Sequence, residues 1–315
     1  EFMNILWVRD GKIGHEKQVK VLLDEVGKSI EVSITEYVVQ PFSTQRFVSC
    51  LFKKLPFIDN EFDIIIGAGH STYSKILNFK KVSRKKAIAI AVLVPSLFKN
   101  RFDLICAPLH DSYKIKNTNN VIFFEGSLAK VSDREPSSNI GFIALGGQNN
   151  HYKFNESHIL KQIKYMLSLY PSKTWYVFNS RRTSKQMNDH LSFLANENNN
   201  VLIVLNDDID SDISFDETIS SASVKLVSQD SMNMVYESLS SKGNTYVFDM
   251  DSIEKDNKIV SQINRLISNR EIGSIEYLNM ADGLKKMQLK PQKEFNDVYA
   301  EVEKLAYKLL QKLSK

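Results

Sequence analysis

A carboxylate and an imidazole near the amino terminus lie in one short segment, and together they could abstract a proton. His15 could act as a general base near neutral pH, and Asp10 could orient its ring. The segment follows an apolar strand predicted at residues 4–9 and precedes an amphipathic helix predicted at residues 16–26. Gly14 would let the backbone approach a ligand closely. A helix-capping turn with an exposed histidine is the alternative interpretation.

Further strand ends in the N-terminal half carry histidine beside small or acidic residues. These residues are Gly69, His70, Ser71, His110 and Asp111. The first three follow a strand predicted at residues 62–68, and either ligand contact or simple turn chemistry explains them. The last two follow a strand predicted at residues 102–107, where a surface turn of the Asx type is slightly favoured.

The second half of the chain carries residues suited to a diphosphate. They are Gly146, Gly147, Ser180, Arg181, Arg182 and Thr183. The glycine pair follows a strand predicted at residues 140–145. The two guanidinium groups and two hydroxyls are predicted at a helix start, in a geometry that matches a diphosphate. A pair of solvated arginines is the alternative. His151 and Tyr152 lie just beyond the glycines and could contact the same ligand.

A later strand, turn and helix could hold a nucleotide. Asp230 and Ser231 form a predicted turn that delivers a helix amino terminus, whose free N–H groups suit a phosphate. Glu237, on the second turn of that helix, could accept both hydroxyls of a ribose. The next segment, residues 244–250, is predicted to be the last strand. An ordinary N-capped helix with a solvated glutamate is the alternative.

Composition narrows the class of protein. The chain has 315 residues, a net charge of +4 and an isoelectric point near 8.8, a mildly basic balance that suits small anions or anionic lipid. No nucleic-acid recognition motif is present, so no nucleic-acid partner is expected. Cys50 and Cys106 form no Cys-x-x-Cys pair, which indicates a cytoplasmic protein. No metal site is predicted, because the histidines lack ligand spacing and the acidic loop at residues 206–216 lacks a calcium-loop pattern.

One segment has the composition of a membrane-surface helix. Residues 41–58 contain eight large apolar side chains mixed with Arg46, Lys53 and Lys54. This pattern suits peripheral association with the cytoplasmic face of an inner membrane. An amphipathic helix buried on its own domain is the alternative.

The order of predicted elements indicates the fold. Strands alternate with segments that can be helical, which favours parallel sheets covered by helices on both faces. The pattern lapses near Gly126 to Asn139 and then restarts. We therefore predict an α/β protein with two Rossmann-like domains facing a cleft. They span residues 3–132 and 139–285, and a C-terminal helix within 286–315 could pack back on the first domain.

Six segments together resemble a known family. They run in order from Trp7 to Gln18, Ala68 to Thr72, Phe102 to Asp111, Leu145 to Tyr152, Ser180 to Thr183 and Asp230 to Glu237. Their sequence is similar to that of the mitochondrial fission protein family, which includes plant and many bacterial proteins. That family in turn resembles GT-B glycosyltransferases, which have two Rossmann-like domains and hold a nucleotide sugar mainly in the C-terminal one.

The resemblance implies roles for the residues above. His15 falls where lipid-linked-sugar GT-B enzymes often place their base, and Glu237 falls where they hold the donor ribose. The other second-half residues named above, apart from His151 and Tyr152, would bind a UDP-, GDP- or CMP-linked sugar. His151, Tyr152 and the remaining first-half residues would line the acceptor side. The chain departs from many GT-B sequences because Gly243 is not followed by the usual proline. A carboxylate at Asp230 would also repel a diphosphate.

We therefore expect a metal-independent glycosyltransferase without a cofactor, acting on a lipid-linked or lipopolysaccharide-type acceptor. Two alternatives remain open at this point. A nucleotide-sugar epimerase could use the same two-domain architecture. A non-catalytic interaction protein would fit the fission role of the plant members.

Overall fold

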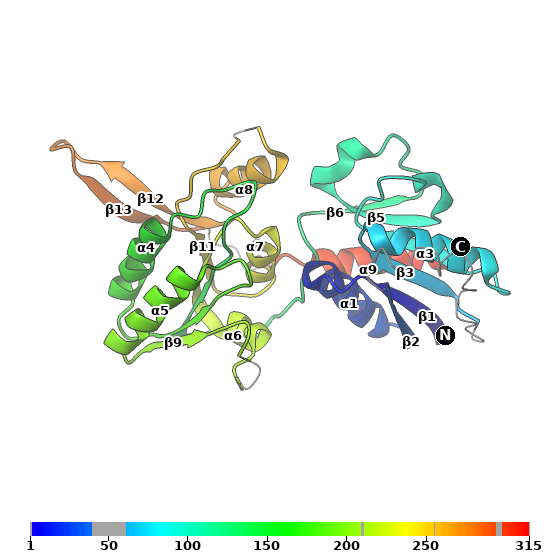
Figure 1. The fold of residues 1–315 in the computed structure, drawn as a ribbon, viewed down its shortest axis with the longest axis horizontal. Helices are drawn as coiled ribbons and strands as arrows, with labels where there is room; N and C mark the ends of the chain where they lie inside the picture. Colours follow the sequence, from blue (N-terminus) through cyan, green and yellow to red (C-terminus); the bar gives the residue numbers. More distant parts are fainter. Residues whose placement is uncertain (1, 40–60, 209–210, 255, 294–297, 315) are drawn as a thin grey trace, which may run out of the picture. The chain divides into compact units, whose positions relative to one another are not determined.

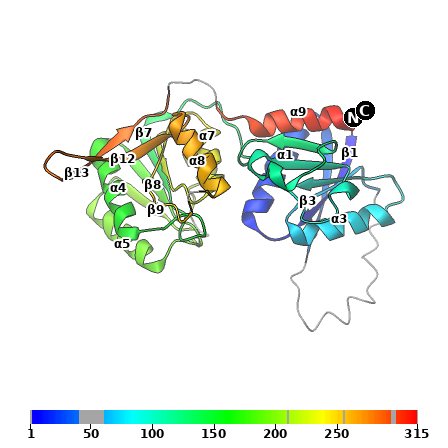
Figure 2. The same ribbon diagram turned by 90° about the horizontal axis from the view of Figure 1, so that it is seen from above.

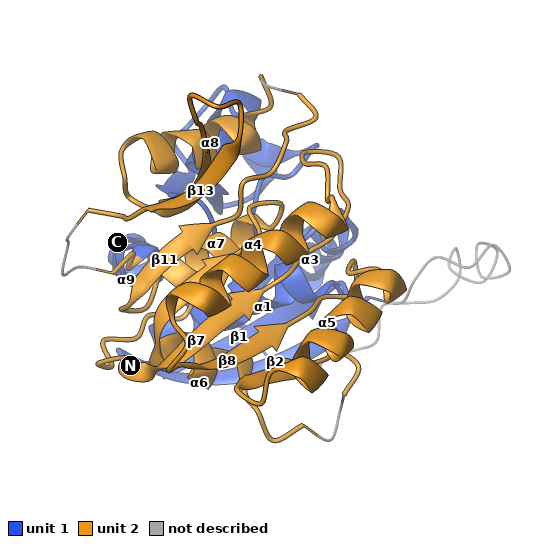
Figure 3. Cartoon of the chain, turned by 90° about the vertical axis from the view of Figure 1, so that its left-hand side faces the viewer, with its two compact units in different colours: residues 1–129, 301–315 blue, residues 130–300 orange. Residues whose placement is uncertain are grey.

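The computed structural model describes residues 2–39, 61–208, 211–254, 256–293 and 298–314. The membrane-surface segment predicted at residues 41–58 lies outside this described part. The chain divides into two compact units, one of residues 1–129 and 301–315 and one of residues 130–300 (Figure 3). Each unit has its own mixed α/β architecture around a mainly parallel sheet, as the sequence predicts.

The described part of unit 1 contains a sheet of six strands in the order β2-β1-β3-β4-β5-β6, and every neighbouring pair is parallel. The strands are β1 (Phe2–Arg9), β2 (Glu31–Val38), β3 (Ile64–Ala68), β4 (Ile88–Val92), β5 (Leu104–Pro108) and β6 (Val121–Phe124). The central strands are continuous apolar runs; all five residues of β3 are buried. Such runs are typical of parallel strands that are covered on both faces.

Helices α1 (Ile13–Gly27), α3 (His70–Val82) and α9 (Glu301–Leu313) belong to unit 1 (Figure 1). Helix α1 begins at Ile13, ahead of the predicted start at residue 16, so His15 lies in its first turn and not in the loop before it. Helix α9 comes from the far end of the chain and packs against α1 and β6 (Figure 2). Its buried face consists of Val302, Leu305, Ala306 and Leu309.

The described part of unit 2 has a seven-stranded sheet in the order β13-β12-β11-β10-β7-β8-β9, with β13 antiparallel to β12. The strands are β7 (Ser137–Ala144), β8 (Thr174–Phe178), β9 (Val201–Val204), β10 (Ala222–Val227), β11 (Asn244–Val247), β12 (Gly273–Asn279) and β13 (Lys285–Lys290). The prediction that residues 244–250 form the last strand was wrong, because a hairpin of β12 and β13 follows. Its half-exposed, lysine-rich second strand lacks a clear apolar alternation.

Both faces of the unit 2 sheet are covered by helices. These are α4 (Glu156–Leu169), α5 (Lys185–Glu197), α6 (Phe215–Ser221), α7 (Met232–Leu239) and α8 (Lys258–Ser268). Apolar residues of α4 and α5 form one core with the sheet, and those of α6, α7 and α8 form the other. Each helix begins at a side chain that accepts a backbone N–H, as at Asn155, Ser184 and Asn257.

A buried lysine fixes the carboxyl end of α7. Lys225 on β10 is fully buried, and its Nζ donates to the carbonyls of Ser238, Ser241 and Lys242 and to the Ser241 hydroxyl. Burial lowers the pKa of this ammonium to about 7. The carbonyls at the negative end of a helix act in the opposite direction and favour the charged form. Lys225 therefore satisfies the Ser238 carbonyl in the last turn of α7 and the carbonyls of Ser241 and Lys242 just beyond the helix.

We expect Lys225→Met to lower the free energy of unfolding by roughly 2–4 kcal/mol, because several buried carbonyls lose their donor. Urea unfolding followed by circular dichroism measures the change. Lys286→Met, at an exposed position on β13, is the matched control and should change stability little. Equal effects of both substitutions would contradict the role assigned to Lys225.

Candidate functional site

In both units, the strand order reverses at one point of the sheet. In unit 1, β1 lies between β2 and β3; in unit 2, β7 lies between β8 and β10. Open α/β sheets bind ligands at the carboxyl ends of the strands beside such a reversal. Asp10 and Gly69 follow β1 and β3, whereas Gly146 and Asp230 follow β7 and β10. These four predicted residues thus fall at the two places where the topology favours a ligand.

A carboxylate and an imidazole meet at the reversal point of unit 1. The Nδ1 atom of His15 lies 2.7 Å from Oδ2 of Asp10. The Asp10 side chain is 1% exposed and that of His15 is 28% exposed. Oδ1 of Asp10 also accepts the N–H of Lys12, at 3.0 Å. A carboxylate that accepts from Nδ1–H favours the tautomer in which Nε2 is the basic nitrogen. The pair therefore has the arrangement of an oriented general base.

Gly69 is placed directly against this pair. Its φ angle is +97°, and a Cβ at this position would lie 2.2 Å from Oδ2 of Asp10 and 2.6 Å from Nδ1 of His15. No other residue fits there without moving one of these two groups. Gly69 thus brings the amino terminus of α3 to the pair. His70 and Ser71, in the first turn of α3, are exposed, and Nδ1 of His70 lies 2.9 Å from the Ser96 hydroxyl.

An ion pair fixes the turn that carries Asp10. The carboxylate of Glu16 accepts Nε and Nη2 of Arg9, at 3.1 and 2.7 Å, and the N–H of Gly11, at 2.9 Å. Arg9 also pairs with Glu36. The hydrogen bond from Arg9 lowers the pKa of Glu16. Sequence reasoning assigned no role to Arg9 or Glu16, although both belong to the segment that resembles the family. The only sign of this ion pair in the sequence is that two opposite charges, Arg9 and Glu16, flank the predicted turn.

His110 and Asp111 stand apart from the Asp10–His15 pair. They lie in a short 3-10 helix, Leu109–Lys114, after β5, and β4 separates β5 from β3. Asp111 pairs with Lys114 at 2.6 Å. His110 is partly buried, burial lowers its pKa, and its Nδ1 has no partner among the described residues. The structure therefore does not join these two residues to the pair.

In unit 2, the loops after β7, β8 and β10 touch one another. The N–H of Gly146 donates to the Ser228 hydroxyl at 2.7 Å, and that of Gly147 donates to Oδ2 of Asp230 at 3.1 Å. A Cβ on Gly146 would lie 2.1 Å from Oδ2 of Asp230, and one on Gly147 would lie 1.9 Å from the Arg182 carbonyl oxygen. The two glycines are required because the neighbouring loops occupy the space of any side chain.

Asp230 and Arg182 form an ion pair beneath this surface. Nη1 of Arg182 lies 2.7 Å from Oδ2 of Asp230 and also donates to the Gly147 carbonyl at 3.0 Å. The Asp230 side chain is fully buried, whereas that of Arg182 is 40% exposed. The carboxylate is thus neutralised by an arginine that still reaches the surface, which removes the repulsion expected from sequence. Oδ1 of Asp230 is buried without a partner among the described residues.

The hydroxyls near Arg182 hold the glycine loop. Ser180 and Thr183 donate to the Gly146 carbonyl, at 2.9 and 2.6 Å. The prediction that this segment starts a helix was wrong: it forms a turn, and α5 begins at Lys185 with Ser184 as its cap. The segment contains no apolar residue whose spacing could mark the helix start. Arg181 and Arg182 are exposed, so their guanidinium groups are the available ligand contacts.

Asn149 and Ser228 also order this region, and sequence reasoning missed both. Oδ1 of Asn149 accepts the N–H groups of His151 and Tyr152, and its Nδ2 donates to the Asp230 carbonyl at 2.7 Å. Tyr152 is buried, and burial, with the charge of Asp230, raises its pKa. His151 is partly exposed. A polar side chain between a glycine pair and a histidine was the only sequence signal for Asn149.

The helix after Asp230 begins as the sequence predicts. Ser231 caps α7 by accepting the N–H of Met234 at 3.4 Å. Glu237 lies on the second turn of α7 and is partly buried. His151 makes a separate contact, because its Nδ1 lies 2.9 Å from Nδ2 of Asn257.

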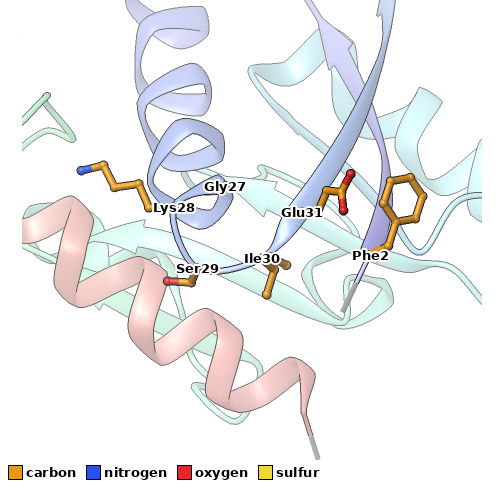
Figure 4. A pocket seen from close by; sticks show the side chains of 6 residues that line it. All are labelled: Phe2, Gly27, Lys28, Ser29, Ile30 and Glu31. Carbon is orange, nitrogen blue, oxygen red and sulfur yellow. The ribbon is translucent and has the colours of Figure 1, made fainter.

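One hollow of unit 1 lies away from the reversal point of that unit's sheet. It is an open pocket of about 620 Å³ at the amino ends of β1 and β2, lined by Phe2, Gly27, Lys28, Ser29, Ile30 and Glu31 (Figure 4). None of the residues predicted for catalysis or binding lines this pocket. Within the described residues, no helix combines the length and apolar character needed to cross a bilayer. No group of three potential metal ligands gathers in that part of the chain either.

Comparison with known proteins identifies the family. The family model described as mitochondrial fission ELM1 matches residues 13–305. Comparison with curated proteins finds none that matches the sequence. The family resemblance drawn from the six segments is confirmed.

Solved structures share the two-unit fold. The UDP-GlcNAc 2-epimerase of Methanocaldococcus jannaschii matches with a TM-score of 0.52 and 11% identity, covering 98% of this chain and 100% of its own. That of Neisseria meningitidis, bound to UDP-GlcNAc, matches with a TM-score of 0.51, 12% identity and the same coverage. The calicheamicin glycosyltransferase CalG4 has a TM-score of 0.46 at 9% identity, covering 99% of this chain and 90% of its own. The two mainly parallel sheets and the matches with TM-scores above 0.5 confirm the predicted fold class, an α/β protein with two Rossmann-like units.

The Glu16 ion pair predicts an acid-sensitive turn. Since the folded state lowers the pKa of Glu16, the pair stabilises the fold above the ordinary value and loses that contribution as pH falls through the lowered value. We expect Glu16→Gln to reduce stability at pH 7 and to lose less further stability than the wild type between pH 5 and pH 3. Thermal unfolding midpoints across this pH range measure both effects.

Arg9→Met is the control for that prediction, because it removes the partner and keeps the carboxylate. The double variant should lose less stability than the sum of the two single losses, as expected for two members of one interaction. Additive losses would contradict the assignment of the acid sensitivity to this pair.

Proposed function

We propose a function for this chain from one premise: the chain belongs to the mitochondrial fission ELM1 family. The proposed activity is metal-independent transfer of a sugar from a nucleotide-sugar donor to a lipid-linked or lipopolysaccharide-type acceptor. His15 is the proposed general base, and the loops around Arg182 form the proposed donor site. The observation that carries the proposal is the Asp10–His15 pair, held against Gly69 at the reversal point of unit 1.

In the proposed reaction, Nε2 of His15 takes the proton of an acceptor hydroxyl. The hydroxyl oxygen then forms a bond with the anomeric carbon of the donor sugar, and the bond from that carbon to the phosphate oxygen breaks. The nucleotide leaves with the electron pair of the broken bond. Asp10 orients the ring and stabilises the imidazolium that forms. Direct attack of this kind inverts the configuration at the anomeric carbon.

The donor site is proposed at the reversal point of unit 2. Arg181 and Arg182 supply exposed guanidinium groups, which suit the charge that develops on a departing phosphate. Asp230 holds Arg182 from below and so acts as a positioning residue. The capped start of α7 at Ser231 adds the positive end of a helix dipole. Glu237, on the same helix, is the proposed ribose acceptor.

A lipid-linked acceptor has support from the surface of unit 1. Leu97 and Phe98, in the loop after β4, are 68% and 54% exposed. Lys99 and Arg101 follow them directly, and the guanidinium of Arg101 lies over the Phe98 ring. Exposed apolar side chains with a basic fringe suit the surface of an anionic membrane. We propose that this loop, together with residues 41–58, brings the enzyme to its acceptor.

Epimerisation of a nucleotide sugar is the second candidate function. Its support is that the matching structures with TM-scores above 0.5 include UDP-GlcNAc 2-epimerases. An epimerase would convert its substrate with no acceptor present, whereas a transferase would show at most slow hydrolysis. Incubation of UDP-GlcNAc alone, followed by separation of the sugar products, distinguishes the two activities.

Nucleotide binding is the first test of the proposal. A nucleotide sugar at about 100 times its dissociation constant should add roughly 2.7 kcal/mol of stability, which raises the unfolding temperature by several degrees. A panel of UDP, GDP, CMP and their sugar conjugates, with and without added metal, measures the shift. Arg182→Gln should abolish this ligand-induced shift, because the variant loses the guanidinium group. Its unfolding temperature without ligand should also fall, because the buried Asp230 loses its ion-pair partner. The exposed Lys185→Gln, at the start of α5, is the control. No shift with any nucleotide would overturn the donor site.

Replacement of the proposed base gives the second test. His15→Ala should lower kcat by about 10²–10⁴-fold, the usual contribution of a general base, while nucleotide affinity stays near that of the wild type. His190→Ala, at an exposed position on α5, is the control and should keep full turnover. Unchanged kcat in His15→Ala would remove this residue from the mechanism.

A further inference from the structure

Unit 2 contains a second pocket, separate from the loops at its reversal point. Its volume is about 380 Å³, and it lies between the first turns of α4, the segment after β11, and the hairpin of β12 and β13. None of the residues that line it belongs to the loops at residues 146–149, 180–183 or 228–231. The proposed nucleotide site does not account for this pocket.

Buried hydrogen bonds fix the walls of the pocket. Gln162 is fully buried; its Oε1 accepts the N–H of Asp249 at 2.7 Å, and its Nε2 donates to the carbonyl of the same residue at 3.0 Å. The N–H of Lys153 donates to the Asp251 carbonyl at 2.9 Å. Because Gln162 holds both backbone groups of Asp249, the main chain at Asp249 is fixed in position. The pocket is therefore built by defined contacts.

An aromatic pair lines one side of the pocket. The rings of His158 and Tyr277 stack at a centroid distance of 5.1 Å and an angle of 22°. Nε2 of His158 lies 3.2 Å from Oδ2 of Asp249, which fixes the imidazole in its plane. The His158 side chain is 35% exposed, although Tyr277 covers one of its faces. A stacked, anchored ring with a partly open surface is a platform on which the apolar face of a sugar ring can pack.

The charges around this platform suit an anionic sugar. Lys153, Lys161 and Lys285 line the pocket with Asp249 and Asp251. Ammonium groups bind a phosphate or carboxylate, and aspartates accept hydroxyl hydrogen bonds from a polyol. The lining also includes the start of α4, a helix of fourteen residues whose dipole adds positive potential. The charged lining therefore suits a polar, anionic ligand better than an uncharged apolar one.

We infer that this pocket binds a phosphorylated sugar, of the kind that an acceptor glycan presents. The inference deepens the proposed function and rests on it for the identity of the acceptor; the chemistry of the pocket stands independently. Nε2 of Gln229, the neighbour of Asp230, donates to the Met250 carbonyl at 3.4 Å, and Met250 lines the pocket. The contact between Gln229 and Met250 thus links the pocket directly to the proposed donor loops.

Isothermal titration of the full chain with glucose 6-phosphate tests the inference. Glucose, glucuronate and inorganic phosphate are the comparison ligands, and they separate the contributions of ring and charge. Glucose 6-phosphate should bind at least fivefold more tightly than glucose or inorganic phosphate, because only it engages both the platform and the lysines. Binding of inorganic phosphate with equal affinity would overturn the assignment to a sugar, and no binding of glucose 6-phosphate would overturn the site.

Two adjacent lysines provide matched variants. Lys285→Gln removes a charge that lines the pocket and should weaken glucose 6-phosphate binding about tenfold. Lys286→Gln removes an exposed charge that does not line it and should leave the affinity unchanged. His158→Ala removes the platform and should also weaken binding of the sugar phosphate, with less effect on inorganic phosphate. Equal affinities in Lys285→Gln and Lys286→Gln would contradict the site.

The failure of this inference can be told apart from the failure of the proposed function. If Arg182→Gln loses nucleotide binding and keeps glucose 6-phosphate binding, two independent sites are supported. If nucleotides bind and glucose 6-phosphate does not, the pocket is overturned and the donor site stands. If glucose 6-phosphate binds through Lys285 and no nucleotide binds, the pocket stands and the proposed transferase is overturned.

Discussion

Each candidate site depends on an aspartate sealed from water directly behind a glycine. Asp10 lies against Gly69, and Asp230 lies against Gly146, at distances that exclude any Cβ. A carboxylate in such a position must be hydrogen-bonded, because an unpaired buried charge is strongly destabilising. In each unit it therefore holds one nitrogen-bearing side chain, His15 or Arg182, which stays partly exposed. The burial of the acid fixes the orientation of the group at the surface.

The same arrangement gives the two units surface groups of different chemical character. A histidine held by an aspartate can exchange a proton near neutral pH, whereas an arginine keeps its charge under all ordinary conditions. Unit 1 therefore presents a group that can take a proton, and unit 2 presents a fixed positive charge. Asp10 follows β1 and Asp230 follows β10, which are central parallel strands. The apolar cores beneath these strands therefore hold the two aspartates in place. The difference between the two surface groups depends on which side chain the aspartate holds, His15 or Arg182.

Much of the fold could be predicted from sequence, because parallel strands buried on both faces are nearly pure apolar runs. The strands predicted at residues 4–9 and 62–68 end at the same residues as β1 and β3, Arg9 and Ala68. The hairpin of β12 and β13 was missed, since its exposed lysines hide the strand pattern. In the candidate sites, the residue types were visible, but the partners were not. That Asp230 would bind Arg182 depends on the pairing of β10 with β7 and of β7 with β8, and a linear sequence does not display such contacts.

Helix α9 has a consequence for how the protein is made. It supplies four buried side chains to unit 1, and its Glu301 carboxylate accepts the N–H of Glu125 at 2.9 Å. The residues that it covers leave the ribosome long before α9 is synthesised. During translation, unit 2 can complete its core first, although it comes later in the sequence, while unit 1 waits with an apolar surface uncovered. The amino-terminal unit therefore cannot be complete until α9 has been synthesised.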